Sequence, residues 1–266
     1  MSGIKINNPV DKDFLIELRR NAYVECTENY LKANNVVGIF GDAIPEEIFY
    51  ACGLIPVPIE GVDSHVFKFG KENEGAGYCD VIKSTLIYLT TQKCPILYSC
   101  KMYVVEDTCK NFYNVIKANT QKEIHIYNTE KELIETLCKN YGTIYDEKVK
   151  QKAKTELNYI KEILERITYY SDMDTEAIFL LKYYTKYMTD LSMRKKYFTV
   201  LNEKIHFQKQ KKNIQIVSSL CPRGNFKNIC NDINSTNIRL ERSWDNSDYG
   251  YAKCIFNFDK EENYKN

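Results

Sequence analysis

Two cysteines, Cys79 and Cys109, are the residues whose type and position best suit chemistry in this chain. Each stands at the start of a predicted helix, and Cys109 directly follows a predicted strand. In open α/β sheets, ligands collect at the carboxyl ends of the strands, against helix N-termini. A helix N-terminus favours the thiolate, which is the form of cysteine that binds metals. The two sulfurs therefore suit a metal or cluster; the alternative is that both are small buried residues at strand–helix junctions.

The elements that must position Cys79 follow an α/β pattern. Residues 12–33 carry apolar groups at helical spacing, and residues 36–40 form a short apolar run typical of a buried strand. Pro45 and the two acids after it begin a helix that stops at Gly53. Residues 54–59 are then extended, and their two prolines predict a strand that lies near an edge of the sheet or is only partly paired. This short span therefore predicts a βαβ unit.

The elements around Cys109 continue the same alternation. The residues that follow Cys79 predict a buried helix, and a strand is expected somewhere within residues 96–105. Thr108 is the expected N-cap of the next helix. A further strand and helix follow, the middle of the chain becomes helical, and strands are expected again at residues 214–217 and 238–240.

The pattern predicts an α/β fold with three parts. We expect a Rossmann-like parallel-sheet domain over residues 1–145, containing Cys79 and Cys109, and a helical segment over residues 146–205. Residues 206–266 are expected to form a partial second α/β domain, shortened because the chain ends before its pattern is complete.

Composition and charge narrow the class of protein. With 37 basic and 36 acidic residues the formal charge is +1, which argues against a nucleic-acid partner. No stretch approaches the ~20 apolar residues that span a bilayer, and the N-terminus does not resemble a secretion signal, so we expect no membrane association and a cytoplasmic location. The ten cysteines form no CxxC pair, which removes the commonest zinc and thioredoxin-like signatures.

Four motifs in order across residues 35–120 resemble the 2-hydroxyacyl-CoA dehydratase family, which includes the benzoyl-CoA reductase subunits. The family pattern is a PEE-initiated helix that runs into a glycine–proline turn, a cysteine that opens a helix, and a second cysteine after an apolar strand. The matching pieces here are residues 45–47, residues 52–57, Cys79 and Cys109. The rest of the chain resembles the family only in outline.

This resemblance implies an oxygen-sensitive [4Fe–4S] cluster held by three cysteines, two of them Cys79 and Cys109. It implies that one iron stays open to the thioester carbonyl of an acyl-CoA. It also implies a homologous partner subunit and a separate ATP-dependent iron–sulfur activator protein that delivers one electron. Iron–sulfur clusters are one-electron devices, for which a protein supplies a dry pocket, orientation and acid–base groups.

The third ligand is where the chain departs from the family, in which it lies late in the second α/β domain. Cys221 is the best local substitute because it follows the apolar run of residues 214–220 much as Cys109 follows its strand. Cys254 and Cys100 are weaker candidates. Cys221 could instead be a buried structural thiol, and without a third sulfur the site would hold an incomplete cluster or none.

Glu46 is the candidate catalytic residue. Glu46 or Glu47, at the sheet edge predicted for the cluster, could carry a proton during loss of the hydroxyl group. The alternative is that both acids only complement a helix N-terminus. The sequence thus predicts an iron–sulfur subunit of a 2-hydroxyacyl-CoA dehydratase-like or benzoyl-CoA reductase-like system. The alternatives are a shortened non-catalytic partner subunit and an α/β interaction protein without a cluster.

Overall fold

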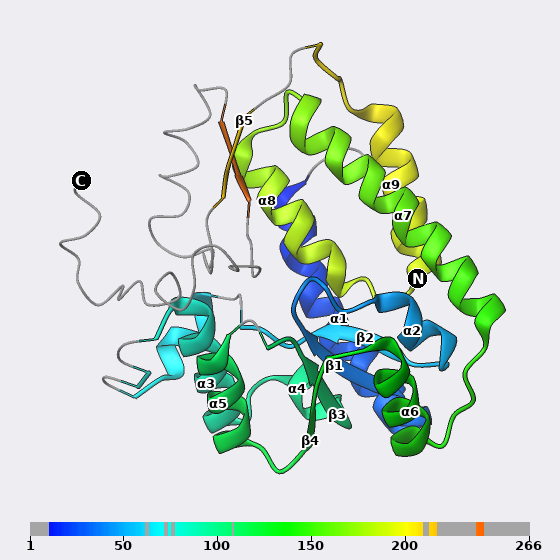
Figure 1. Ribbon diagram of the computed structural model, residues 1–266. Helices are drawn as coiled ribbons and strands as arrows, with labels where there is room; N and C mark the ends of the chain where they lie inside the picture. Colours follow the sequence, from blue (N-terminus) through cyan, green and yellow to red (C-terminus); the bar gives the residue numbers. More distant parts are fainter. Residues whose placement is uncertain are drawn as a thin grey trace.

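The protein has a mixed α/β fold built on a parallel sheet (Figure 1). The computed structural model describes residues 11–61, 64–71, 74–75, 78–107, 109–209, 213–216 and 238–241. Within these ranges, no helix is both long enough and apolar enough to cross a membrane.

Four strands form the main sheet, in the order β2-β1-β3-β4, and all neighbouring strands are parallel. Their bounds are β1 Val36–Phe40, β2 Ile55–Pro58, β3 Met102–Val105 and β4 Glu123–Ile126. Strand β1 is buried along its whole length, as its uninterrupted apolar run predicts. The proline-containing strand β2 lies at the edge of the sheet, which confirms the sequence prediction.

Helices cover both faces of this sheet and continue into a helical segment. Their bounds are α1 Lys12–Ala33, α2 Glu46–Ala51, η1 Ser64–Phe69, α3 Asp80–Thr91, α4 Pro95–Ser99, α5 Lys110–Asn119, α6 Glu130–Tyr141, α7 Glu147–Tyr170, α8 Thr175–Tyr184, η2 Thr185–Tyr187 and α9 Leu191–Lys204. A separate pair of parallel strands, β5 Asn213–Ile216 and β6 Ile238–Glu241, follows. The Rossmann-like prediction for the main sheet is therefore confirmed.

The two faces of the sheet belong to two separate apolar clusters. The larger cluster contains buried residues of α1, α3 and α5, and we call this side of the sheet the first face. The smaller cluster contains buried residues of α2 and α6, which cover the second face. Layers of helix on both faces of a parallel sheet follow from βαβ connections, because each connecting helix must bury its apolar stripe.

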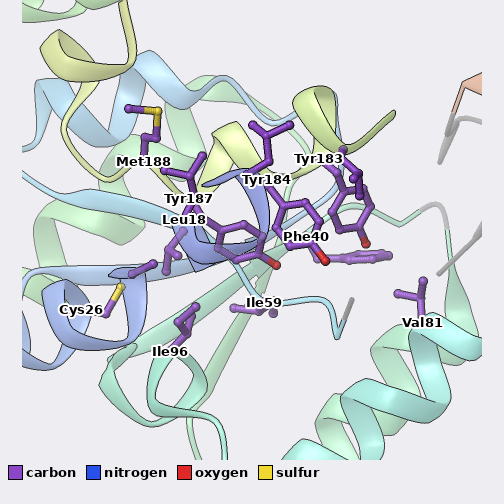
Figure 2. Close-up of a cluster of buried hydrophobic side chains, with 14 of the residues drawn as sticks. Leu18, Cys26, Phe40, Ile59, Val81, Ile96, Tyr183, Tyr184, Tyr187 and Met188 are labelled. Carbon is purple, nitrogen blue, oxygen red and sulfur yellow. The ribbon is translucent and has the colours of Figure 1, made fainter. Parts of the chain in front are cut away.

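The larger cluster also takes in the helical segment. Figure 2 shows Tyr183, Tyr184 and Tyr187 gathered near Phe40, the last residue of β1. The rings of Tyr183 and Tyr184 are 5.8 Å apart, and those of Tyr184 and Tyr187 are 6.1 Å apart. One core thus continues across residue 145, where the sequence predicts a domain boundary.

The strand expected somewhere within residues 96–105 is β3, which begins only at Met102 because Pro95 occupies the first turn of the short helix α4 and its ring favours that geometry. One local prediction needs correction. The N-cap of α5 is Cys109 and not Thr108, so the cysteine itself caps the helix.

Candidate functional site

Cys109 lies at the point where the order of the strands reverses. The chain passes from β1 to β2 on one side and returns to β3 on the other side of β1, so β1 and β3 are neighbours with diverging connections. The crevice outside the carboxyl ends of two such strands is the usual ligand position in open α/β sheets. Cys109 follows β3 at this crevice and is the N-cap of α5.

The sulfur of Cys109 faces the first turn of its helix. The Phe112 backbone N–H donates a hydrogen bond to Cys109 Sγ at 3.4 Å. The Phe112 ring stacks on the Phe40 ring with their centroids 3.5 Å apart, and both side chains are fully buried. The thiol is therefore held beside an apolar surface and against a helix amide, and only 5% of Cys109 is exposed.

Cys79 also begins a helix, α3, but its side chain accepts no capping hydrogen bond. It is the N-cap of that helix and 1% exposed. Helices α3 and α5 pack against each other, and both cysteines belong to the larger apolar cluster (Figure 1). Both predicted positions at the mouths of helices are thus confirmed, and the two helices cover the same face of the sheet.

A buried acid connects, by hydrogen bonds, the loops that follow β1 and β3 at the point where the strand order reverses. Glu106 follows β3, and its Oε1 accepts hydrogen bonds from the backbone N–H groups of Ala43 and, at 3.1 Å, Ile44. Gly41 has a φ of +127°, and a Cβ atom there would lie 2.2 Å from the Glu106 carboxyl carbon, so glycine is required. Burial raises the pKa of Glu106, and the N–H of Ala43 offsets part of that shift.

Glu46 lines a charged cleft beside the same carboxyl edge. This cleft has a volume of about 400 Å³ and lies between the β1–α2 loop, the start of α2, and helices α7, α8 and α9. Arg194 Nη2 of α9 donates to Glu46 Oε2 at 2.6 Å, and Lys186 pairs with Asp42. Glu46 follows β1 and Cys109 follows β3, so both lie at the carboxyl edge of the sheet, although α2 covers the second face and α5 the first.

The candidates for the third ligand have different positions. Cys221 and Cys254 lie outside the described residues. Cys100 is the C-cap of α4 and precedes β3, whereas Cys109 follows that strand, so Cys100 belongs to the opposite edge of the sheet. Within the described ranges, no three His, Cys, Asp or Glu side chains converge as a metal site.

Arg194 is the residue of this cleft that the sequence reasoning missed. Its side chain is 4% exposed, and its Nε has no hydrogen-bond partner among the described atoms. In α9 it shares a buried stripe with Leu191, Phe198 and Leu201, spaced by three or four residues. An arginine in an apolar helical stripe was therefore the available signal, because a buried guanidinium requires a charged partner.

Comparison with known proteins adds no family assignment. A scan against protein-family models and a search of curated proteins both found no match for this chain.

Proposed function

We propose that this chain is the iron–sulfur subunit of a 2-hydroxyacyl-CoA dehydratase-like or benzoyl-CoA reductase-like system, with Cys79 and Cys109 as cluster ligands. One observation carries the proposal: both cysteines are N-caps of packed helices that cover one face of the sheet. A helix N-terminus presents unsatisfied N–H groups and partial positive charge. Two thiolates there, with their negatively charged cluster, receive favourable electrostatic interaction.

The donor set fits the cluster as far as it is described. Two thiols at the N-termini of packed helices are soft ligands of the kind that iron–sulfur clusters require. The proposed third thiolate is Cys221, outside the described residues. When bound, a [4Fe–4S] cluster supplies one-electron chemistry for dehydration or reduction of an acyl-CoA.

The chain's own residues have two supporting roles in this proposal. Phe40 and Phe112 exclude water from the side of Cys109, which strengthens electrostatic interactions there. Glu46 is the proposed proton carrier, and Arg194 orients its carboxylate in the charged cleft. The proposed partners are an acyl-CoA, a homologous subunit and an ATP-dependent iron–sulfur activator.

The test is anaerobic purification followed by iron and sulfide analysis. The proposal predicts about four irons and four sulfides per chain for a [4Fe–4S] cluster. Protein that is folded yet contains neither element contradicts it. With iron present, an activator-dependent assay on a panel of acyl-CoA thioesters separates an active subunit from a shortened non-catalytic partner, since only the former turns over with its partner subunit.

A second candidate is an α/β interaction protein without a cluster. It is favoured by the burial of both cysteines in the larger apolar cluster, at 1% and 5% exposure. Cys109 already satisfies one helix N–H as a cap, which is a structural role in itself. Under this alternative, replacing either cysteine by alanine changes stability and leaves metal content at background.

A further inference from the structure

A second pair of cysteines lies on the other face of the sheet. Cys52 is the C-cap of α2, and Cys138 lies in the last turn of α6. Their Sγ atoms are 4.0 Å apart, although 86 positions separate them in the sequence. A disulfide needs an S–S distance of about 2.05 Å, so the pair is reduced here and the sulfurs must approach each other to bond.

The backbone holds the two cysteines together. The Cys52 N–H donates to the carbonyls of Ile48 and Phe49, at 3.1 and 3.0 Å, which closes the end of α2. The Cys138 carbonyl accepts from the Gly142 N–H at 2.9 Å, which closes the end of α6. The chain beyond α6 then returns to α2 through a 2.9 Å hydrogen bond from the Asp146 N–H to the Ala51 carbonyl. The thiol contact therefore joins two anchored helix ends.

The two thiols differ in access to solvent. Cys52 is only 1% exposed, whereas Cys138 is half-buried, so a small oxidant reaches Cys138 first. Burial and the neighbouring Cys138 raise the pKa of Cys52 to about 12. Because the thiolate is the nucleophile, Cys52 is unsuited to react first with an external oxidant. The Cys52 sulfur nevertheless lies only 4.0 Å from the Cys138 sulfur, so it is in position to attack once Cys138 has been oxidised.

We infer that Cys52 and Cys138 are a redox modification site that forms a reversible intramolecular disulfide with a peroxide as oxidant. The Cys138 sulfur attacks one peroxide oxygen, the O–O bond breaks, and one water leaves from hydrogen peroxide as Cys138 becomes a sulfenic acid. The Cys52 sulfur then attacks Cys138, the S–O bond breaks, and the hydroxyl leaves with the Cys52 proton as a second water. The two thiols lose two electrons and the peroxide gains two; a dithiol reductant reverses the reaction.

The disulfide covalently joins α2 to α6. Helix α2 is short and begins at Glu46, which lines the charged cleft and binds Arg194. Oxidation therefore restrains one side of that cleft without consuming the thiols of Cys79 and Cys109 on the first face. The inference does not depend on the proposed iron–sulfur function, because neither of its sulfurs is a proposed ligand.

The experiment treats the purified full-length protein with hydrogen peroxide, blocks remaining thiols under denaturing conditions, and maps the peptides by mass spectrometry. We expect a linked pair of peptides that contain Cys52 and Cys138, with a mass two hydrogen atoms below the sum of the two reduced peptides. This linked species should disappear after treatment with dithiothreitol. The oxidised protein should also melt at a higher temperature, because a cross-link restricts the unfolded chain.

The variants Cys52→Ala and Cys138→Ala should each lose the linked peptides and the rise in melting temperature, while Cys26→Ala, a buried thiol on the first face, keeps both. Because Cys138 is only half-buried, its variant keeps the test valid even where Cys52→Ala fails to fold. Two results overturn the inference: both thiols stay open to alkylation in peroxide-treated wild type, or either one is linked mainly to a different cysteine.

Discussion

The two cysteine pairs lie at opposite ends of their helices. Cys79 and Cys109 are N-caps of α3 and α5 on the first face, whereas Cys52 and Cys138 lie at the carboxyl ends of α2 and α6 on the second. Partial positive charge at a helix N-terminus favours thiolate, and partial negative charge at the C-terminus favours the neutral thiol. The helix ends therefore give the two pairs different electrostatic surroundings, in line with the proposed metal binding on the first face and with the need for an oxidant such as peroxide on the second.

The largest effect expected from the proposed function is loss of the proposed cluster from variants of the first pair only. Cys79→Ser and Cys109→Ser should each reduce iron from about four per chain to a small fraction of that value, because the cluster loses a thiolate ligand. Cys52→Ser and Cys138→Ser are the matched controls and should retain full iron. Iron and sulfide analysis after anaerobic purification measures this difference, and equal iron in all four variants would remove the distinction between the pairs.

A large effect on stability is expected from residues beside each pair. Phe112→Ala removes a buried ring stacked on Phe40 and should reduce the free energy of unfolding by about 3–5 kcal/mol. Leu137→Ala, next to Cys138, should cost about 2–5 kcal/mol. Urea denaturation measures both. Only Phe112→Ala should also lower iron content, so a similar loss of iron in Leu137→Ala would contradict the assignment of the cluster to the first face.

A smaller effect is expected at the start of α2. Glu46→Gln removes the negative charge opposite the buried Arg194, and we expect a loss of about 1–3 kcal/mol, limited by the 19% exposure of the Glu46 side chain. Glu47→Gln is the control and should stay within about 0.5 kcal/mol of wild type. Thermal denaturation measures both variants. If Glu46→Gln and Glu47→Gln reduce stability equally, the ion pair does not hold α2 in place.

The smallest effect is a pH dependence at Glu106. Burial raises the pKa of Glu106 in the folded protein, so its contribution to stability is complete below the unfolded pKa and is lost as pH rises through the folded pKa. Glutamine cannot ionise and still offers an oxygen to the N–H groups of Ala43 and Ile44. The stability of Glu106→Gln relative to wild type should therefore increase from about pH 4 to about pH 7.

Denaturant titrations at several pH values test this expectation, with the exposed neighbour Asp107→Asn as control. A constant difference between Glu106→Gln and wild type over this range would show that the carboxyl does not titrate abnormally. Together with the Glu46 variants, this experiment distinguishes the contribution to stability of the loops at the sheet edge from that of the helices that cover the two faces.

The sequence by itself determined the alternation of strands and helices, the edge position of β2, and the placement of Cys79 and Cys109 at helix starts. These are local properties: two prolines exclude Ile55–Pro58 from the sheet interior, and an apolar run predicts the buried strand β1. The start of β3 was less predictable, because Pro95 suits the first turn of a helix as well as an extended segment.

Only the tertiary structure decided which residues meet. The contact between Cys52 and Cys138 and the ion pair of Glu46 with Arg194 join positions 86 and 148 apart in sequence. Such contacts depend on which face each helix covers and on the approach of Arg194 of α9 to the first residue of α2. Helical spacing reports which side of a helix is buried, but it does not identify the partner, because any apolar surface satisfies the same stripe.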